Sequence, residues 1–434
     1  MSAVWTSSAT VKSTGPRQRQ QQQQQSISQH STQILTPPSS PQLSSFAASK
    51  RAVGKTSNPV LIFVVQNQIS LPLYIIGALL ATHLFLPFQH ITSKFFSLSH
   101  RVGHSGLYVK GKDDIFFVFF WVLAFTFIRA FMMDYIFVPF AIHSGISSKK
   151  GLTRFAEQAW SWSYCVALCS LGTYLAYNSS YWFNLDELWL QWPHRELQPL
   201  FKFYYLVQLS FWLQQILVLN IEKRRKDFTQ MFTHHIVTSV LLIASYNYCF
   251  TRAGNVILCL MDIVDIALSS AKMLKYLGFQ TLCDYAFGVF ILLWIVTKHI
   301  LFVKVTFSAM FDAQNLIGYK CFFDPLDDVI SVGDSQLVAR GLNKSSTSSG
   351  DEQCFTELVQ FSFVSLLWIL QVIGLVWLYM IIKVAFKVIT GSGADDSRSD
   401  DEDESEEIEE NDIDDDDDEV TLVDSHENLV SVKS

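Results

Sequence analysis

Four ionisable side chains occur in a stretch that is otherwise apolar enough to cross a membrane. His234 and His235 are adjacent near the start of one apolar segment, and Asp262 and Asp265 lie three residues apart in the next. Ionisable groups at membrane depth cost free energy, so they usually face a cavity and take part in function. These four residues are therefore the candidate catalytic group.

Imidazole and carboxylate groups together suit acyl transfer. A histidine, with a reference pKa of about 6.5, can remove or supply a proton near neutral pH, and it can carry an acyl group itself. An aspartate that accepts a hydrogen bond from one ring nitrogen fixes the tautomer, as in a catalytic triad. We expect His234 or His235 to be the nucleophile or base and Asp262 or Asp265 to orient it. The choice within each pair stays open.

Helix geometry allows the two pairs to meet. Asp262 and Asp265 share a helix face, because residues three apart lie on the same side. A rise of ~1.5 Å per residue puts His235 about 10 Å into its helix, and Asp265 about 16 Å from the far end of the next, antiparallel one. Adjacent histidines lack the i,i+4 spacing of a helical zinc pair, so no metal ion is expected.

The elements that must position these residues are membrane-spanning helices. Half of the 434 residues are hydrophobic and only 17% are charged, against about 25% in soluble proteins. A helix needs about 20 apolar residues to cross a bilayer. The predicted fold is all-α and polytopic, with about eight spans. The spans are 70–88, 115–138, 159–177, 200–220, 231–250, 254–276, 284–307 and 359–386.

Composition divides the chain into four parts. Residues 1–58 are rich in Gln, Ser and Pro and read as a disordered arm, and 59–152 hold the first two spans. The next six spans, over 153–386, form the predicted catalytic domain. The tail over 387–434 carries 18 acidic residues against Arg398 between 395 and 419, so it predicts disorder and argues against nucleic acid as a partner. Two tail serines that precede acidic residues, Ser399 and Ser405, fit an acid-directed kinase.

Basic residues in short loops predict the orientation. The loops that hold Lys149 and the run over 223–226 fall on the same side as the basic N-terminal arm, which places both termini in the cytosol. The basic loop at 89–114 falls on the opposite side and contradicts this rule.

Two loops assigned to the lumen carry features that suit an oxidising compartment. Each has a glycosylation sequon, and the second has two cysteines that could form a disulfide there. The residues concerned are Asn178, Asn343, Cys321 and Cys354.

The stretches HHIVTSVLLIASY and TRAGNVILCLMDIVDIALSSAKMLKY closely resemble the signature of the longevity-assurance family of ceramide synthases, which carry a TLC domain. The resemblance covers about 153–386. The extra first span and the acidic tail are similar to fungal members. Animal members typically read His-Asp where this chain has Met261-Asp262, so a role for that extra histidine does not transfer.

The resemblance implies a fold and a reaction. The last six spans would form a helical barrel around a lipid cavity in the endoplasmic reticulum membrane. The enzyme would N-acylate a sphingoid long-chain base with a very-long-chain acyl-CoA, giving ceramide and CoA, with acyl-CoA as co-substrate and no other cofactor. The family also implies a small single-span accessory subunit, a homo- or paralogue hetero-oligomer, and phosphorylation of the tail.

Further basic residues are candidates for substrate binding. The run Lys223, Arg224, Arg225 and Lys226 could hold the phosphates of CoA, although a topology signal explains it equally well. Lys298 and His299, in the seventh predicted span, could contact a polar part of a substrate.

Two other function classes compete with the enzyme. A non-catalytic TLC protein that binds lipids or assists translocation would share the fold, since a fold does not decide function. Such a scaffold has no need to bury four ionisable groups. A proton-coupled transporter could use the same four groups, but the two halves of the chain show no inverted repeat.

Overall fold

The computed structural model describes residues 63–64, 66–221, 227–322, 329–331 and 353–389. Several predicted features therefore lie outside the described residues. They are the arm over 1–58, nearly all of the acidic tail, the basic run Lys223 to Lys226, the sequon at Asn343, and the serines Ser399 and Ser405.

The described chain is built from helices, with one small sheet. In chain order the main helices are α4 (Ser70–His83), α5 (Leu86–Phe96), α6 (Asp114–Met132), α7 (Val138–His143), α8 (Lys149–Tyr177), α9 (Pro199–Ile221), α10 (Phe228–Asn247), α11 (Thr251–Tyr276), α12 (Gln280–Trp294), α13 (Phe302–Phe307), α14 (Ala313–Ile317) and α16 (Glu357–Ile389). A 3₁₀ turn, η2, covers Asp186–Leu188. Strands β1 (Lys320–Phe322), β2 (Val329–Ser331) and β3 (Gln353–Phe355) form an antiparallel sheet in the order β2-β1-β3.

Two of the long apolar helices contain π-helical turns. Segment η1 (Met133–Phe137) joins α6 to α7, and η3 (Ile295–Leu301) and η4 (Ser308–Asp312) join α12, α13 and α14 into one continuous run. π-Helical turns are rare and occur frequently at functional sites. One of them, η3, carries Lys298 and His299.

Within the described residues, three helical runs are long and apolar enough to cross a membrane by length and composition alone: Asp114–His143, Gln280–Ile317 and Glu357–Phe386. Helices α8 to α11 are long enough but carry more polar side chains, many of which line a cavity. Membrane character therefore rests on these apolar runs, and the count of eight spans stays a prediction.

The predicted first span over 70–88 is wrong as a single helix. Helix α4 ends at His83 after 14 residues, about 21 Å, which is short of the ~30 Å hydrocarbon core. Phe85 is extended, and α5 begins with Pro87 in its first turn. Pro87 has no backbone N–H to donate to the carbonyl of His83, four residues earlier, and its ring would clash with that carbonyl, so α4 cannot continue through this point.

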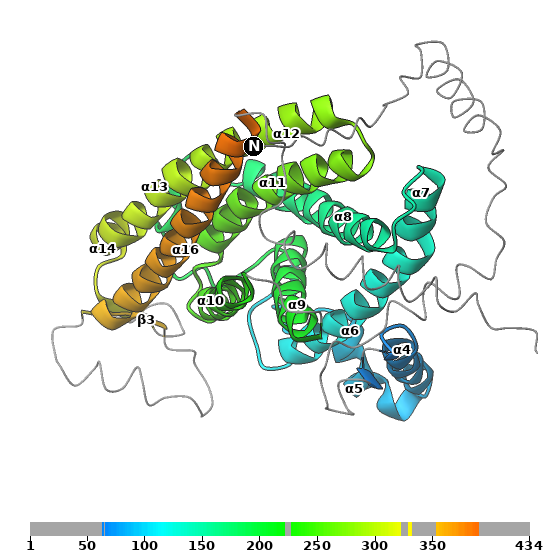
Figure 1. The fold of residues 1–434 in the computed structure, drawn as a ribbon. Coiled ribbons are helices and arrows are strands. Elements are labelled where there is room, and N and C mark those ends of the chain that lie inside the picture. Colours follow the sequence, from blue (N-terminus) through cyan, green and yellow to red (C-terminus); the bar gives the residue numbers. More distant parts are fainter. Residues whose placement is uncertain (1–62, 65, 222–226, 323–328, 332–352, 390–434) are drawn as a thin grey trace, which may run out of the picture. The chain divides into compact units, whose positions relative to one another are not determined.

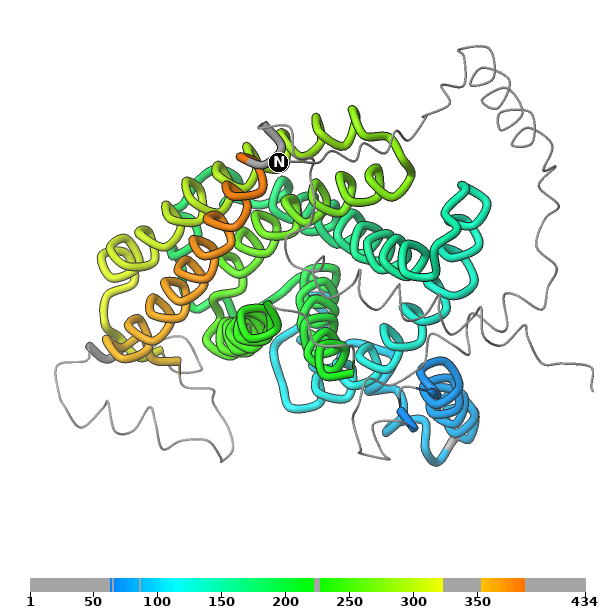
Figure 2. Tube along the Cα trace, in the orientation of Figure 1, coloured from blue at the N-terminus to red at the C-terminus, as the bar shows by residue number. Residues whose placement is uncertain are grey.

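Six helical segments pack in sequence around the region of the histidines. Helix α8 packs on α9 and α11, α9 on α10, and α10 on α16. In turn α16 packs on the α12–α14 run, and that run packs on α11 (Figure 1). Helix α6, from the N-terminal part of the chain, packs on α9, and α9 lies beside α10, as the cyan and green segments of Figure 2 show.

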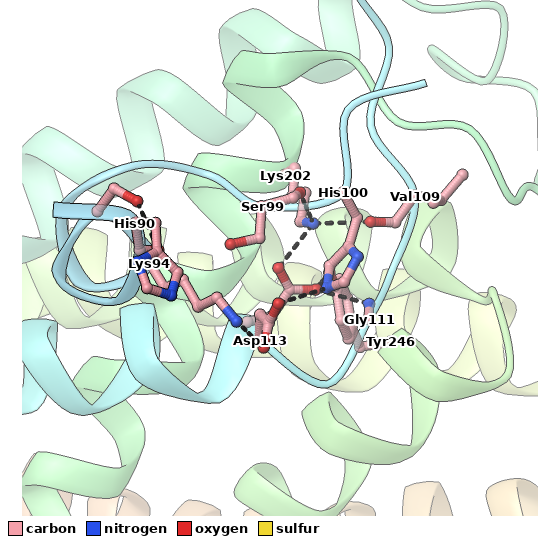
Figure 3. A network of polar contacts seen from close by, with 11 residues as sticks. His90, Lys94, Ser99, His100, Val109, Gly111, Asp113, Lys202 and Tyr246 are labelled. Carbon is pink, nitrogen blue, oxygen red and sulfur yellow. Dashed lines mark hydrogen bonds and ion pairs between the residues drawn. The ribbon is translucent and has the colours of Figure 1, made fainter. Parts of the chain in front are cut away.

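A buried polar network, here named the anchor network, joins α6, α9 and α10 (Figure 3). Lys202 Nζ lies 2.7 Å from Asp114 Oδ1 and donates to the carbonyl oxygens of Val109 (2.7 Å) and Ser99 (2.9 Å). The other oxygen, Asp114 Oδ2, accepts from Tyr246 Oη at 2.7 Å and from a backbone N–H of the 97–113 loop. The lysine is fully buried, and its three N–H groups are all used.

Two of the basic residues between 89 and 114, which contradicted the predicted orientation, have partners in the structure. Lys94 forms an ion pair with Asp113 at 3.0 Å, and Lys110 donates to the backbone carbonyl of Asn247 at the end of α10. These two cations are used in local structure, so their presence in the 89–114 loop is explained without reversing the topology.

The segment between α8 and α9 is tied to the small sheet and to the helix ends. Trp189 donates to Ser308 Oγ (2.9 Å), Trp192 to the Tyr248 carbonyl (3.0 Å), and Arg195 to the Phe322 carbonyl (2.9 Å). A disulfide between Cys321 and Cys354, the pair singled out in the sequence, joins β1 to β3. Asn178 is exposed just after α8.

His194, in this segment, makes the stability of the fold depend on pH. Burial lowers the pKa of His194 to about 4, and the charge of Arg252 acts in the same direction. The unfolded chain, with a histidine pKa of about 6.5, therefore binds more protons between pH 4 and 6.5. Stability should be complete above pH 6.5 and fall as the pH drops towards 4, by an amount on the order of 2 to 3 kcal/mol. In His194→Gln, the thermal unfolding midpoint should fall less steeply across this interval. An unchanged slope would contradict the assignment.

Candidate functional site

Two cavities adjoin between the six packed segments. The polar cavity has a volume of about 380 Å³, and the histidine and aspartate pairs both line it, together with Lys272, Lys275 and Lys298. The apolar cavity is narrower, about 80 Å³, and its walls include Phe250, Ile257, Phe363 and Leu367. The structure thus brings all four candidate catalytic residues to one cavity.

His234 borders both cavities. It shares this position with Trp212, whereas His235 and the two aspartates line the polar cavity only. The imidazole is half-buried between two indoles, edge to face with Trp212 at 5.5 Å and with Trp377 at 5.2 Å between ring centroids. Within the described residues the structure gives it no hydrogen-bond partner. Its ring nitrogens are therefore available to a group held where the cavities meet.

His235 is held more firmly. It is 6% exposed, and its Nδ1 donates to the carbonyl oxygen of Met231 at 2.6 Å, one turn back in α10. With the proton on Nδ1, the neutral ring keeps a lone pair on Nε2. His235 can accept a proton through Nε2, but it is oriented by its own helix.

The two aspartates have different surroundings. Asp262 is 2% exposed, and its Oδ2 accepts from Gln208 Nε2 at 2.9 Å. Gln208 Oε1 in turn accepts from Tyr164 Oη at 2.5 Å, so α8, α9 and α11 meet at this carboxylate. Asp265 is half-buried, lines the polar cavity, and has no protein hydrogen-bond donor among the described residues. Asp265 is consequently the carboxylate open to a ligand.

The histidines and aspartates have other hydrogen-bond partners in the structure than the predicted ones, and the orienting role of an aspartate stays a prediction. Within the described chain no hydrogen bond joins either histidine to either aspartate. The Met231 carbonyl takes the Nδ1 proton of His235, and Gln208 occupies Asp262. The helix backbone supplies an acceptor one turn away, so the imidazole does not need a carboxylate to fix its tautomer.

Lys298 and His299 have different surroundings in the structure. Lys298 is 7% exposed and lines the polar cavity, with its Nζ 4.5 Å from the centroid of the Trp294 indole. His299 does not line that cavity. It accepts a hydrogen bond from Trp294 Nε1 at 3.1 Å, and its Nδ1 lies 2.7 Å from the side-chain amide of Gln371 on α16. The contacts of His299 are with neighbouring side chains, and a contact between His299 and substrate stays a prediction.

Sequence reasoning missed several residues of the polar cavity. Lys272 and Lys275 follow the aspartates along the cavity side of α11. The spacing from Asp265 to Lys272 is seven residues, two helical turns, so this shared face was readable from the sequence. Arg129 on α6 and Glu157 on α8 also line the cavity, but they come from distant parts of the chain, and no local pattern marks them.

Among the described residues, no group of three or more His, Cys, Asp or Glu side chains is arranged to hold a metal ion. What the arrangement supplies is an imidazole that borders both cavities, a second imidazole, an open carboxylate and a buried ammonium, next to an apolar cavity.

Comparison with known proteins places the chain in a family. Residues 154–383 match the TLC domain. A sphingosine N-acyltransferase-like protein of Alternaria alternata is 45% identical over 300 residues, covering 68% of this chain and 69% of the relative. A sphingosine N-acyltransferase of Schizosaccharomyces pombe is 40% identical over 343 residues (79% and 81%), and a ceramide synthase of Gibberella moniliformis is 37% identical over 330 (75% and 76%). The chain therefore belongs to the TLC-domain family, in the longevity-assurance group of fungal sphingosine N-acyltransferases, and is an acyltransferase.

Proposed function

We propose that this protein is a ceramide synthase that transfers a fatty acyl group from acyl-CoA to the amine of a sphingoid base, with His234 as the nucleophile. The observation that carries the assignment is the position of His234 at the junction of a polar and an apolar cavity. Both substrates are part polar and part hydrocarbon, so the reacting atoms must sit at such a junction. The names of the relatives support the substrate classes.

The reaction takes place in two steps. A ring nitrogen of His234 attacks the thioester carbonyl carbon, the carbon–sulfur bond breaks, and CoA leaves as a thiolate. The amine of the sphingoid base then attacks the acyl-imidazole, the bond to the histidine breaks, and the amide forms. Asp265 accepts the proton that the amine loses, because it is the open carboxylate of the polar cavity. The thiolate takes the ring proton of the acyl-imidazolium, and Asp265 passes the amine's proton to the imidazole as the bond to the acyl group breaks, which balances the reaction.

The acyl chain would occupy the apolar cavity. Its walls are almost entirely hydrocarbon and aromatic, which suits a fatty acyl chain. A volume of about 80 Å³ is small for a long chain, so the lining side chains must move apart, or the chain must extend into the bilayer.

Family membership also supports a proposal for the compartment and the membrane topology. We propose a polytopic protein of the endoplasmic reticulum membrane, with both termini cytosolic and the six segments from α8 to α16 forming the barrel around the two cavities. The single-span accessory subunit and the oligomer stay predictions.

The test is direct. Purified full-length protein would receive a sphingoid base and acyl-CoA of several chain lengths, and products would be measured by mass spectrometry. Ceramide formation is the expected result. Well-folded protein that makes none, alone and after co-expression with candidate subunits, would overturn the proposal in favour of a lipid-binding role.

Lys272 and Lys275 are expected to bind the phosphates of CoA. They lie about 10 and 15 Å beyond Asp265 along the same side of α11, by the helix rise, so phosphates there would leave the thioester near His234. Replacing both with alanine should raise the KM for acyl-CoA about tenfold and leave kcat nearly unchanged, because the contact is equal in the ground and transition states. The KM for an acyl-pantetheine without phosphates should not change. Lys383→Ala, an exposed lysine on α16, is the matched control. If that variant had the same effect, a general surface charge would explain it instead.

A further inference from the structure

Lys298 occupies a position that the two-step reaction does not yet use. It is the cation on the α12–α14 run that lines the polar cavity, and it lies within the π-helical segment η3. It lines this cavity together with His234, Asp262 and Asp265. An ammonium group 7% exposed among apolar helices is costly, which favours a functional role over a structural one.

A chain of contacts fixes the place of this ammonium. The Trp294 indole lies 4.5 Å below Lys298 Nζ, close enough for a cation–π interaction. Trp294 Nε1 can only donate a hydrogen bond, and it donates to His299 Nε2. His299 Nδ1 therefore carries the ring proton. Gln371 Nε2 lies 2.7 Å from Nδ1, so the Gln371 amide must be turned by 180° for its oxygen to accept this proton. His299 and Gln371 thus fix the orientation of the Trp294 indole, and the indole contacts the Lys298 ammonium.

The same indole reaches the nucleophile by a second route. Trp294 contacts Trp377 edge to face at 6.2 Å, and Trp377 contacts the ring of His234 at 5.2 Å. Lys298 and His234 are therefore positioned by one aromatic cluster, whose members Trp294 and Trp377 are 4% and 8% exposed. A rigid, preorganised charge beside a reacting centre is the arrangement that stabilises developing negative charge most effectively.

We propose that Lys298 stabilises the thiolate of CoA as it leaves, and that Trp294, His299 and Gln371 are positioning residues for it. This inference rests on the proposed function. As His234 forms its bond to the acyl carbon, the electron pair of the broken carbon–sulfur bond goes to sulfur, and the negative charge develops beside the ammonium. Lys298 stays protonated, and the thiolate takes its proton from the imidazole, which returns to neutrality as the acyl-imidazole.

The test compares leaving groups. Full-length Lys298→Met and Lys298→Arg would react with acyl-CoA and with an acyl thioester of thiophenol, and the rate of acyl adduct formation would be read by intact mass. An aryl thiolate is a better leaving group and needs less stabilisation. Lys298→Met should therefore slow adduct formation from acyl-CoA about 10²- to 10³-fold, but slow it far less with the aryl thioester. Lys298→Arg should restore part of the rate. Lys304→Met, an exposed lysine six residues on, is the control and should change neither rate.

Equal losses with both thioesters in folded Lys298→Met would overturn the inference, because a packing defect does not depend on the leaving group. Acyl-pantetheine, an alkyl thioester without phosphates, should show the same loss as acyl-CoA. A loss confined to acyl-CoA would also overturn the inference, because it would assign Lys298 to phosphate binding. An unchanged rate would overturn it too. If Lys298→Met does not fold, Trp294→Phe keeps a ring but removes the hydrogen bond to His299. It should give a smaller loss with the same dependence on the leaving group, and a loss without that dependence would count against the inference. Wild type that forms neither adduct nor ceramide would contradict the proposed function itself.

Discussion

His234→Ala should abolish both the acyl adduct and ceramide formation, lowering kcat by about 10⁴-fold or more, because loss of a nucleophile removes the reaction path itself. His235→Ala should retain the adduct and lose much less rate than His234→Ala, because in the proposed reaction the amine's proton goes to Asp265 and not to His235. The difference follows from geometry. His234 borders both cavities, whereas His235 lines one and donates its Nδ1 proton to Met231.

The measurement is intact mass after a single turnover with acyl-CoA, without sphingoid base. Each variant is first checked for its elution profile and its thermal midpoint. His234→Gln, which keeps a polar side chain without a nucleophilic nitrogen, serves as the matched replacement. An adduct in folded His234→Ala that disappears in His235→Ala would exchange the two roles. The absence of an adduct in wild type that nevertheless makes ceramide would favour direct attack by the amine, with histidine as base.

That these four residues meet at one cavity could be predicted from the sequence, because ionisable residues are conspicuous in apolar, membrane-spanning segments. His234, His235, Asp262 and Asp265 share the polar cavity, as their depths along two antiparallel helices predicted. Membership of the family was readable for the same reason, since the signature lies in these two helices. A soluble protein would hide such residues among many other charged ones.

The hydrogen-bond partners of those residues could not be predicted from the sequence. The partner of Asp262 is Gln208, which is 54 residues away on α9, and nothing in either segment announces the contact. The Met231 carbonyl that orients His235 is local but is a backbone group, and every helix offers one. Hydrogen-bond partners depend on which helices become neighbours, and apolar periodicity does not specify that.

The helix interruptions also differ in whether the local sequence predicts them. The break after His83 is encoded locally by Pro87. The π-helical segment η3 contains no proline or glycine, and its sequence IVTKHIL does not distinguish it from ordinary helix. Packing against α11 and α16 accompanies the extra residue in that turn, and the turn places Lys298 in the cavity and His299 against Gln371.

The largest effect on stability is expected from the anchor network rather than from the catalytic site. Lys202→Met removes the cation but leaves the Asp114 carboxylate, whose side chain is 5% exposed, without its ion-pair partner. It also leaves the carbonyls of Ser99 and Val109 without a donor. Breaking one partner of a buried ion pair costs about 3 to 5 kcal/mol. The thermal midpoint of the purified protein should therefore fall by many degrees.

A more exposed ion pair, between the end of α5 and the start of α6, provides the control. Lys94 and Asp113 lie 3.0 Å apart, but their side chains are 35% and 31% exposed, so Lys94→Met should cost at most about 1 kcal/mol. The triple variant Lys202→Met, Asp114→Leu, Tyr246→Phe removes the charges and the hydroxyl together and should recover much of the lost stability, because no polar side chain of the network is left unpaired. A Lys202→Met protein as stable as wild type would show that the pair contributes nothing.

The anchor network also joins α6, which precedes the matched domain, to helices of that domain. The matched domain begins at residue 154, but Asp114 lies on α6, before that boundary, and bonds Lys202 on α9 and Tyr246 on α10, the histidine-bearing helix (Figure 3). Helix α6 further contributes Arg129 to the polar cavity. A protein that begins at residue 154 would lack Asp114, the partner of the buried Lys202, and Arg129, which lines the polar cavity. It should unfold at a lower temperature than Lys202→Met, and a shortened protein as stable as the full chain would separate the two regions.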